Sequence, residues 1–320
     1  MKIVMLEPLG ISEESVMSLA KPFIDQGHEF VFCGKKIETE EEVISRASGA
    51  DVFIIANSPL SGKVIRSAPN LKMISVAFTG VDHVDKAACA EKNLLVSNAQ
   101  GYCTDAVAEL AFGLMLSVLR NILPCDARTR EGRTKDGLVG NELSGKTIGI
   151  IGTGAIGRRV AEIGKVFGCK VLGYSRTQSE EAKAMGIQYL PLDELLKQSD
   201  IISLHTPLTD ETKNLISRER IALMKPNAIL INTARGAVVD NKALAEALNE
   251  GRIAGAGIDV FETEPPIPTE HPLNSAKNTT LTPHIAFATK ESMFRRAQIT
   301  FGNISSWMAG KPENVKIQPK

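Results

Sequence analysis

The sequence predicts an α/β protein with two doubly wound parallel-sheet domains. Short apolar segments alternate with helix-forming segments along almost the whole chain, which is typical of parallel strands connected by helices. At 320 residues the chain is long enough for two domains, each with its own hydrophobic core. Near its middle, a glycine-rich turn at residues 152–157 joins a strand directly to a helix, as expected at the start of a second α/β unit.

The composition argues against several classes of partner. Lys and Arg together number 37, as do Asp and Glu, and no basic block occurs, so we expect no nucleic-acid partner and no membrane contact. No run approaches the ~20 consecutive apolar residues of a spanning helix, and the N-terminus lacks a signal-peptide pattern, which indicates a cytoplasmic protein. The 5 cysteines are scattered without C-x-x-C spacing, so we predict neither a disulfide nor a metal site.

The N-terminal part of the chain predicts one small doubly wound unit. Buried-strand patterns such as KIVML and VFIIA are separated by polar segments of helical character. Because strands alternate with helices, the strands are expected to run parallel. We expect strands at residues 2–6, 29–33, 52–56, 72–77 and 94–97, and helices at residues 12–27, 38–47, 62–68 and 84–91.

Residues 104–123 predict one long helix that begins at the capping pair Thr104 and Asp105. The helix is apolar on nearly every face, and such a helix must be buried on several sides. Packing within its own domain would bury it, and so would a subunit interface. A polar stretch that contains glycine, residues 129–141, follows this helix.

A βαβ unit with the motif G-x-G-x-x-G comes next. Strand 148–151 ends at Gly152, the turn continues through Gly154 to Gly157, and an amphipathic helix leads to a second strand at 170–174. The first glycine allows a tight turn, the second lets the backbone approach a pyrophosphate, and the third lets the helix pack closely on the strand. The helix N-terminus presents N–H groups and a positive dipole end to phosphates. A glycine-rich turn can serve packing alone, but this order of elements favours dinucleotide binding.

The alternation of strands and helices continues to the end of the chain. Repeated βα units that share one parallel sheet indicate a doubly wound domain, whose ligands bind at the carboxyl ends of the strands. We expect strands at residues 187–189, 200–205, 228–233, 253–260 and 279–282, and helices at residues 179–185, 192–198, 217–223, 241–250 and 290–309.

Three of these strands end in residues that can do chemistry. Arg235 follows one strand, Asp259, Glu262 and Glu264 follow the next, and His284 follows the last. An arginine fork binds a carboxylate with two hydrogen bonds, and a histidine oriented by a carboxylate can shuttle a proton near neutral pH. Each residue alone could be structural, as an ion pair, a turn residue or a solvated loop charge. Their shared position downstream of a dinucleotide motif favours an active site.

From about Lys72 to its end, the chain resembles the D-isomer-specific 2-hydroxyacid dehydrogenase family, in particular its glyoxylate and hydroxypyruvate reductase branch. The resemblance depends on long blocks that occur in the order of the family. They are GTGAIGRRVAEIGKVFG, HTPLTDETKNLI at 205–216, INTARGAVVD at 231–240, GAGIDVFETEPP at 255–266 and LTPHIAFAT at 281–289.

The resemblance implies the reaction and its catalytic residues. A small 2-oxo acid such as glyoxylate or hydroxypyruvate would be reduced to the D-2-hydroxy acid by hydride from NAD(P)H. Arg235 would bind the carboxylate and keto oxygen of the substrate, and His284 would protonate the carbonyl oxygen. Glu264 would hydrogen-bond His284 and keep it protonated.

The resemblance also implies binding residues. The backbone at Thr79 and Gly80, next to Phe78, would receive the substrate carboxylate. No residue is expected to bind a metal. The implied cofactor contacts are Thr104, Gly152, Gly154, Ala155, Ile156, Gly157, Ser175, Arg176, Thr177, His205, Thr206, Pro207, Thr212, Thr233, Ala234, Asp259 and Ala286.

The family layout is a Rossmann cofactor domain inserted in a smaller, discontinuous, flavodoxin-like substrate domain. It implies a substrate domain of residues 1–99 and 288–320 and a cofactor domain of residues 100–287. The two crossings, near 98–101 and 286–289, would act as hinges. The region of helix 104–123 is the one through which family members dimerise, so the resemblance implies a homodimer.

The sequence departs from the family pattern at the end of the second strand of the cofactor domain. NAD-preferring sites carry an acidic residue there, whereas this chain has Ser175, Arg176 and Thr177, which can hold a 2′-phosphate by charge-assisted hydrogen bonds. We therefore expect NADP(H) to be preferred, with NAD(H) as a second cofactor. Phe78 and Thr134 stand where many members have a small residue and a tryptophan, which leaves the size of the substrate open.

Two alternatives stay open. One is a D-3-phosphoglycerate or D-lactate-type dehydrogenase, because the catalytic residues are shared across the family. The other is a nucleotide-sensing binding module, as in the corepressor branch of the family, whose members keep Arg235, Glu264 and His284 as well.

Overall fold

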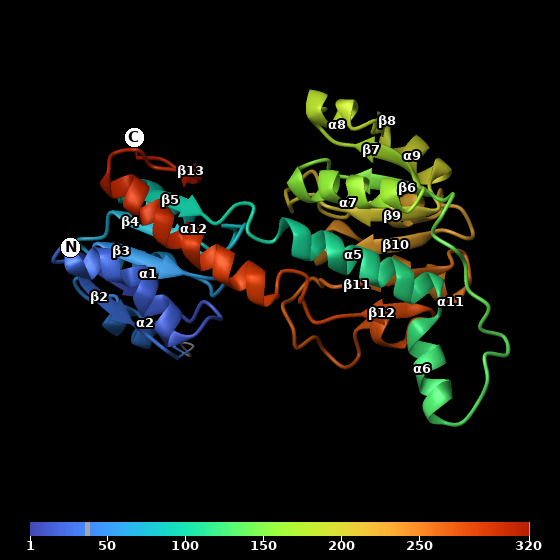
Figure 1. The fold of residues 1–320 in the computed structure, drawn as a ribbon, viewed down its shortest axis with the longest axis horizontal. Helices are drawn as coiled ribbons and strands as arrows, with labels where there is room; N and C mark the ends of the chain where they lie inside the picture. Colours follow the sequence, from blue (N-terminus) through green and yellow to red (C-terminus); the bar gives the residue numbers. More distant parts are fainter. Residues whose placement is uncertain (36–38, 320) are drawn as a thin grey trace. The chain divides into compact units, whose positions relative to one another are not determined.

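The computed structural model describes residues 1–35 and 39–319. The chain forms two compact units, the first made of Met1–Cys103 with Ala288–Lys320 and the second of Thr104–Phe287 (Figure 1). Both units are sheets covered by helices, so the predicted fold class is confirmed. The first residue of the predicted helix 38–47, Glu38, lies outside the described residues.

The sheet of the first unit has the strand order β13-β5-β4-β3-β1-β2. All its strand pairs are parallel except β13 with β5. Without β13 this is the flavodoxin-like order, in which consecutive βα units add strands on both sides of the first strand. The strands are β1 (Lys2–Met5), β2 (Glu29–Phe32), β3 (Val52–Ile55), β4 (Met73–Val76), β5 (Leu95–Asn98) and β13 (Val315–Ile317).

The helices of this unit begin at the polar caps that the sequence contains. Ser12 accepts a hydrogen bond from Ser15 N at the start of α1, and Thr289 and Ser292 form a capping box at the start of α12. The helices α1 and α12 pack on each other, and Figure 1 shows them in front of the sheet. The bounds are α1 (Glu13–Asp25), α2 (Glu40–Arg46), α3 (Gly62–Ser67), α4 (Lys86–Glu91) and α12 (Lys290–Met308).

Strand β13 is absent from the sequence prediction. It has three residues and pairs antiparallel with β5 through a shifted register between Val315 and Ile317. Such a short segment carries no measurable alternation of its own. Its pairing partner is more than two hundred residues away in sequence, at Val96 and Ser97, so no local signal predicts it.

The sheet of the second unit has the strand order β12-β11-β10-β9-β6-β7-β8, with every pair parallel. This is the Rossmann order, and the order reverses between β6 and β9. A ligand is expected at that switch point, beyond the carboxyl ends of the strands. The strands are β6 (Thr147–Ile151), β7 (Lys170–Tyr174), β8 (Gln188–Tyr189), β9 (Ile201–Leu204), β10 (Ile229–Asn232), β11 (Gly255–Ile258) and β12 (Thr279–Leu281).

Helices α5 and α7 pack on each other and lie in front of this sheet in Figure 1. The apolar character of α5 is explained by its burial, because Phe112, Leu114 and Met115 belong to a core with Ile148 and Ile231. The helices are α5 (Thr104–Leu119), α6 (Ile122–Arg130), α7 (Ala155–Val166), α8 (Glu180–Ala184), α9 (Leu192–Gln198), α10 (Arg218–Ile221) and α11 (Asn241–Asn249), with short 3₁₀ turns η1 (Gly236–Val238) and η2 (Pro272–Ser275).

The prediction of a single helix over residues 104–123 is wrong beyond residue 119. The chain leaves α5 after Leu119, Asn121 adopts a left-handed conformation with φ of 52°, and α6 runs at 61° to α5. Pro124 explains the break, because it has no N–H and its ring would collide with the carbonyl of Arg120 in a continuous helix. Asparagine tolerates the left-handed region better than other residues with a side chain.

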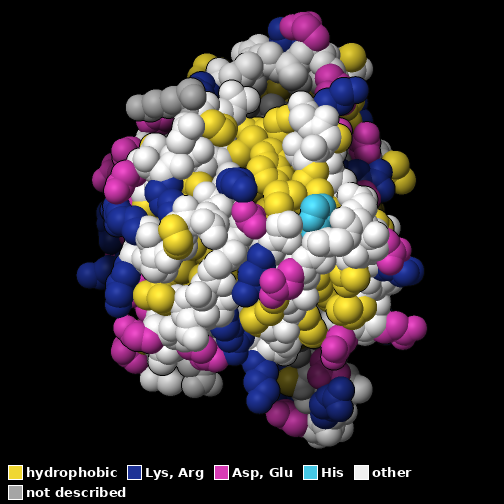
Figure 2. Space-filling view, turned by 90° about the vertical axis from the view of Figure 1, so that its left-hand side faces the viewer, with side chains coloured by type: hydrophobic (Ala, Val, Ile, Leu, Met, Phe, Trp, Pro, Cys, Tyr) yellow, Lys and Arg dark blue, Asp and Glu magenta, His cyan; other side chains and the backbone are white. Residues whose placement is uncertain are grey.

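The surface mixes both signs of charge with exposed hydrophobic side chains. Figure 2 shows one face, on which hydrophobic side chains gather between Lys, Arg, Asp and Glu side chains. Exposed hydrophobic residues of the first unit include Met17 and Ile24 on α1 and Phe294 on α12. Across the described ranges no single helix has the length and apolar character needed to cross a membrane; α5 and α6 meet that test only when joined across their bend.

Candidate active site

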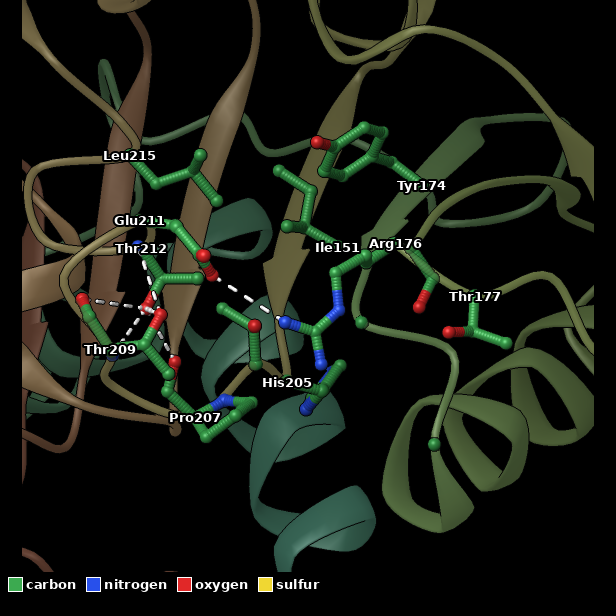
Figure 3. Close-up of a pocket in the computed structure, with 14 residues that line it drawn as sticks. Ile151, Tyr174, Arg176, Thr177, His205, Pro207, Thr209, Glu211, Thr212 and Leu215 are labelled. Carbon is green, nitrogen blue, oxygen red and sulfur yellow. Dashed lines mark hydrogen bonds and ion pairs between the residues drawn. The ribbon is translucent and has the colours of Figure 1, made fainter.

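A pocket opens at the switch point of the second sheet (Figure 3). It is lined by the residues that follow β6, β7 and β9, which are the strands on either side of the reversal. The lining residues are Ile151, Gly152, Gly154, Tyr174, Ser175, Arg176, Thr177, His205, Thr206, Pro207, Thr209, Glu211, Thr212 and Leu215.

The turn between β6 and α7 requires its glycines. Gly152 has φ of +96°, and a Cβ there would lie 2.5 Å from the carbonyl oxygen of His205. At Gly157, a Cβ would collide with the carbonyl of Gly152. The N-cap of α7 is Gly154, which has no side chain and meets nothing within 4 Å at its Cβ position. The first turn of α7 therefore presents backbone N–H groups to an anion, as a dinucleotide pyrophosphate needs.

Two buried polar atoms after β9 and β10 lack a hydrogen-bond partner among the described residues, and one of them belongs to a residue that lines the pocket. His205 Nε2 lies 2.8 Å from Ser203 Oγ, whereas His205 Nδ1 has no hydrogen-bond partner among the residues that the structure describes. Thr233 Oγ1, after β10, is likewise buried without a partner within those residues. Buried polar atoms are normally hydrogen-bonded, so Nδ1 of His205, a residue that lines the pocket, is suited to a ligand. The pocket thus fits a dinucleotide cofactor.

The pH dependence of stability should reveal the buried His205. Burial lowers the pKa of His205 from 6.5 to about 3. As the pH falls through 6.5, the histidine therefore binds a proton in the unfolded chain but not in the folded chain. Folding stability is therefore lost as pH falls below that value. We expect the free energy of unfolding, measured by urea titration, to fall by about 2 kcal/mol more in the wild type than in His205→Gln between roughly pH 7 and pH 5.

Parallel curves for the wild type and His205→Gln would contradict a neutral, buried His205.

One side of the pocket holds a charged pair. Arg176, after β7, lies opposite Glu211, after β9, with Arg176 Nη1 3.5 Å from Glu211 Oε2 (Figure 3). Thr212 Oγ1 donates to the carbonyl of Pro207 over 2.7 Å and accepts from Thr209 N at 2.7 Å, which closes the loop that carries Glu211. Sequence reasoning predicted Arg176 but missed Glu211. The sequence feature that could have indicated Glu211 is its position inside the HTPLTDETKNLI block.

A histidine and a glutamate pair at the carboxyl edge of the same sheet. His284 follows β12, and its Nδ1 lies 2.7 Å from Glu264 Oε2, on the segment after β11. The His284 side chain is largely buried, with 13% of its surface exposed, whereas Glu264 is exposed. His284 has φ of 58°, a left-handed conformation that costs energy for a residue with a side chain. Such strain is kept at functional sites when the surrounding contacts hold it.

Asp259 provides those contacts. It is fully buried, and its Oδ1 accepts hydrogen bonds from Thr282 Oγ1 at 2.6 Å and Ile285 N at 2.9 Å, while Oδ2 accepts from Ala286 N at 2.9 Å. The Asp259 carbonyl accepts from His284 N at 2.8 Å. Burial raises the pKa of Asp259 above its ordinary value despite these hydrogen bonds. Asp259 therefore holds the loop around His284, a role that the sequence prediction did not include.

Arg235 is positioned by the end of β10. Asn232, buried in that strand, donates from Nδ2 to the carbonyl of Arg235 at 3.0 Å and accepts from Ala234 N at 3.0 Å. Arg235 Nη1 donates to the carbonyl of Ala234 at 2.7 Å. A Cβ on Gly236 would overlap the backbone of Phe261, so the loops after β10 and β11 touch at this glycine.

The predicted cofactor residues divide into two groups. Those that line the pocket are Gly152, Gly154, Ser175, Arg176, Thr177, His205, Thr206, Pro207 and Thr212. The others lie outside it: Ala155, Ile156 and Gly157 open α7, Thr104 begins α5, Thr233 and Ala234 follow β10, Asp259 follows β11 and Ala286 follows β12. Within the described ranges, no group of three or more His, Cys, Asp or Glu side chains could hold a metal ion.

The predicted substrate loop belongs to the first unit and follows β4. Phe78 is nearly buried, and its ring packs against those of His83 and Tyr102. Asn98 Nδ2 donates to the carbonyl of Thr79 at 2.5 Å, and Ala99 N donates to the carbonyl of Phe78 at 3.0 Å. The loop is therefore held to the end of β5, and it ends at Gly80.

Comparisons with known proteins agree with this geometry. The family model for the NAD binding domain of D-isomer specific 2-hydroxyacid dehydrogenases matches residues 112–286. A glyoxylate reductase of Aeropyrum pernix is 41% identical over 286 residues, which cover 86% of this chain and 85% of that protein. A hydroxypyruvate reductase of Blautia hydrogenotrophica is 36% identical over 298 residues, covering 90% of this chain and 92% of that protein.

A solved structure gives the same result for the fold. An acyclic imino acid reductase, in complex with NADPH and D-Arg, superposes with a TM-score of 0.88 at 33% identity and covers 99% of this chain and 100% of that chain. The chain therefore belongs to the D-isomer-specific 2-hydroxyacid dehydrogenase family and is an oxidoreductase that uses a nicotinamide cofactor.

Proposed function

We propose that the protein reduces a small 2-oxo acid, glyoxylate to glycolate or hydroxypyruvate to D-glycerate, and prefers NADPH to NADH. The observation that carries this proposal is the 2.7 Å pair of His284 and Glu264 at the sheet edge that also bears Arg235 and the pocket. The relatives named glyoxylate reductase and hydroxypyruvate reductase support the choice of substrate.

His284 would act as the proton donor. The nicotinamide cofactor, when bound, supplies the hydride that the carbonyl carbon receives. Glu264 accepts a hydrogen bond from Nδ1–H of His284, which orients the ring and leaves Nε2 to carry the proton that moves to the carbonyl oxygen. In the reverse direction, Nε2 takes the proton back from the hydroxyl group.

Arg235 would bind the carboxylate of the substrate. Its guanidinium presents several donors in one plane, which match two carboxylate oxygens or one of them together with the keto oxygen. The hydrogen bonds of Asn232 to the backbone of Arg235 and Ala234 would keep this side chain in place during turnover. The role of Phe78, Thr79 and Gly80 in receiving the carboxylate is proposed from the family resemblance.

Arg176 would favour NADPH by binding the 2′-phosphate of its adenosine ribose. It lines the adenosine side of the pocket with Ser175 and Thr177, both of which carry hydroxyl groups. A charge-assisted contact of this kind is available only to NADPH. The solved relative in complex with NADPH supports this preference.

The two compact units would serve different ligands. The second, Thr104–Phe287, would be the cofactor domain, and the first, with its loop Phe78–Gly80, the substrate domain. We also propose a homodimer that forms through the region of α5 and α6. The exposed side chains of Ile122, Leu123 and Val139 support this, because large apolar side chains on a surface favour association.

The proposed function is tested by initial rates with a panel of 2-oxo acids. NADPH or NADH would be mixed with glyoxylate, hydroxypyruvate, pyruvate, 2-oxoisocaproate or phenylpyruvate, and oxidation of the reduced cofactor followed. We expect the largest kcat/KM with NADPH and one of the first two acids. Oxidation of D-3-phosphoglycerate with little reduction of the panel would instead identify a phosphoglycerate dehydrogenase. Cofactor binding without turnover of any acid would favour the nucleotide-sensing alternative.

A further inference from the structure

We propose that Glu211 sets the ratio between NADPH and NADH use, because it competes with the 2′-phosphate for Arg176. The inference rests on the proposed binding of NADPH through Arg176. Glu211 would thus determine cofactor specificity, although it lies 35 residues after Arg176 in the sequence and approaches it only in the folded chain.

The geometry places the two side chains across one pocket. Arg176 follows β7 and Glu211 follows β9, both line the pocket, and Figure 3 shows their side chains pointing toward each other. Arg176 Nη1 lies 3.5 Å from Glu211 Oε2. Both side chains are well exposed, at 86% and 74% of their surface, so neither is held by packing and both are able to turn toward a ligand.

An exposed ion pair of this length is weak, because water screens both charges. A 2′-phosphate carries more negative charge than the Glu211 carboxylate, so it can take Arg176 from Glu211. The exchange leaves Glu211 close to a phosphate of the same sign. Part of the affinity for NADPH is thereby lost to charge repulsion.

NADH carries a 2′-hydroxyl where NADPH carries a 2′-phosphate, so Glu211 would interact with it differently. An NAD-preferring Rossmann site uses a carboxylate to accept hydrogen bonds from the ribose hydroxyls. The segment after β7 has no such residue, and among the described residues that line the pocket Glu211 is the one carboxylate. Glu211 is thus the acceptor available to the 2′-hydroxyl of NADH, and its charge discriminates against NADPH.

The test is steady-state kinetics of Glu211→Gln with NADPH and with NADH at saturating hydroxypyruvate. Glutamine keeps the size of the side chain and removes its charge. We expect the ratio of kcat/KM for NADPH to kcat/KM for NADH to rise about three- to tenfold, through a lower KM for NADPH and a higher KM for NADH. The control Glu194→Gln removes a carboxylate that pairs with Lys197 at 2.8 Å on α9, away from the pocket, and should leave the ratio unchanged.

A parallel variant, Arg176→Ala, separates this inference from the proposed function. If it weakens NADPH and NADH equally, the proposed phosphate contact of Arg176 is wrong. If it weakens NADPH alone while Glu211→Gln leaves the ratio unchanged or lowers it, the role of Glu211 is overturned and the proposed function stands. A selective loss in Arg176→Ala together with a raised ratio in Glu211→Gln supports both.

Discussion

Replacing His284 by alanine is expected to lower kcat for reduction of hydroxypyruvate by about 10²–10⁴-fold and to leave the Kd for NADPH nearly unchanged. The structure pairs His284 with a carboxylate at the sheet edge bearing Arg235, with Nδ1 2.7 Å from Glu264 Oε2. Without His284, the proton for the developing alkoxide must come from water, whereas the glycine turn at Gly152, which we propose binds the cofactor, is untouched. Stopped-flow turnover and fluorescence titration of NADPH measure the two quantities.

A second histidine–glutamate pair in the same unit provides the control. His271 Nε2 lies 3.0 Å from Glu262 Oε2, and neither residue has the left-handed backbone conformation of His284. His271→Ala should keep most of the wild-type kcat. The proposed proton donor is wrong if His284→Ala retains more than about a tenth of the wild-type kcat, since general acid catalysis supplies more than that.

Replacing Asp259 by alanine is expected to destabilise the protein by about 3 kcal/mol or more and to lower kcat strongly. The change leaves Thr282 Oγ1, Ile285 N and Ala286 N without the acceptor that each now uses, and a buried donor without a partner costs roughly 1–3 kcal/mol. The same hydrogen bonds hold the segment in which His284 is left-handed, so His284 should also lose its orientation.

Urea unfolding and kcat are measured on the same samples of this variant. Asp259→Asn is the matched control, because its remaining oxygen still accepts hydrogen bonds, and its effects should be smaller on both measurements. An alanine variant whose free energy of unfolding lies within about 1 kcal/mol of the wild type and whose kcat is normal would contradict the role assigned to Asp259, since the loss of three hydrogen bonds requires a larger change.

The features that could be predicted from the sequence are those that depend on residues close together in the sequence. Short apolar runs between helical segments predicted the parallel strands of both sheets, and the glycines from Gly152 to Gly157 predicted the turn between β6 and α7. The rule that ligands bind at strand ends also predicted that Arg235, Glu264 and His284 lie at one edge of the sheet, and the structure pairs the last two.

The features that could not be predicted depend on contacts between distant parts of the chain. Strand β13 forms because its backbone pairs with the edge strand β5, and its three residues are too few to show a strand pattern of their own. The pairing of Arg176 with Glu211 arises because the strand order brings the ends of β7 and β9 to opposite sides of β6. The break between α5 and α6 was predictable in principle, because Pro124 forbids the continuous helix that the apolar pattern favoured.

The most direct test of the proposed reaction is the product formed from hydroxypyruvate and NADPH by the wild-type enzyme, identified by chiral chromatography. We expect D-glycerate in the same amount as the NADPH oxidised. L-glycerate, or oxidation of NADPH without glycerate, would contradict it.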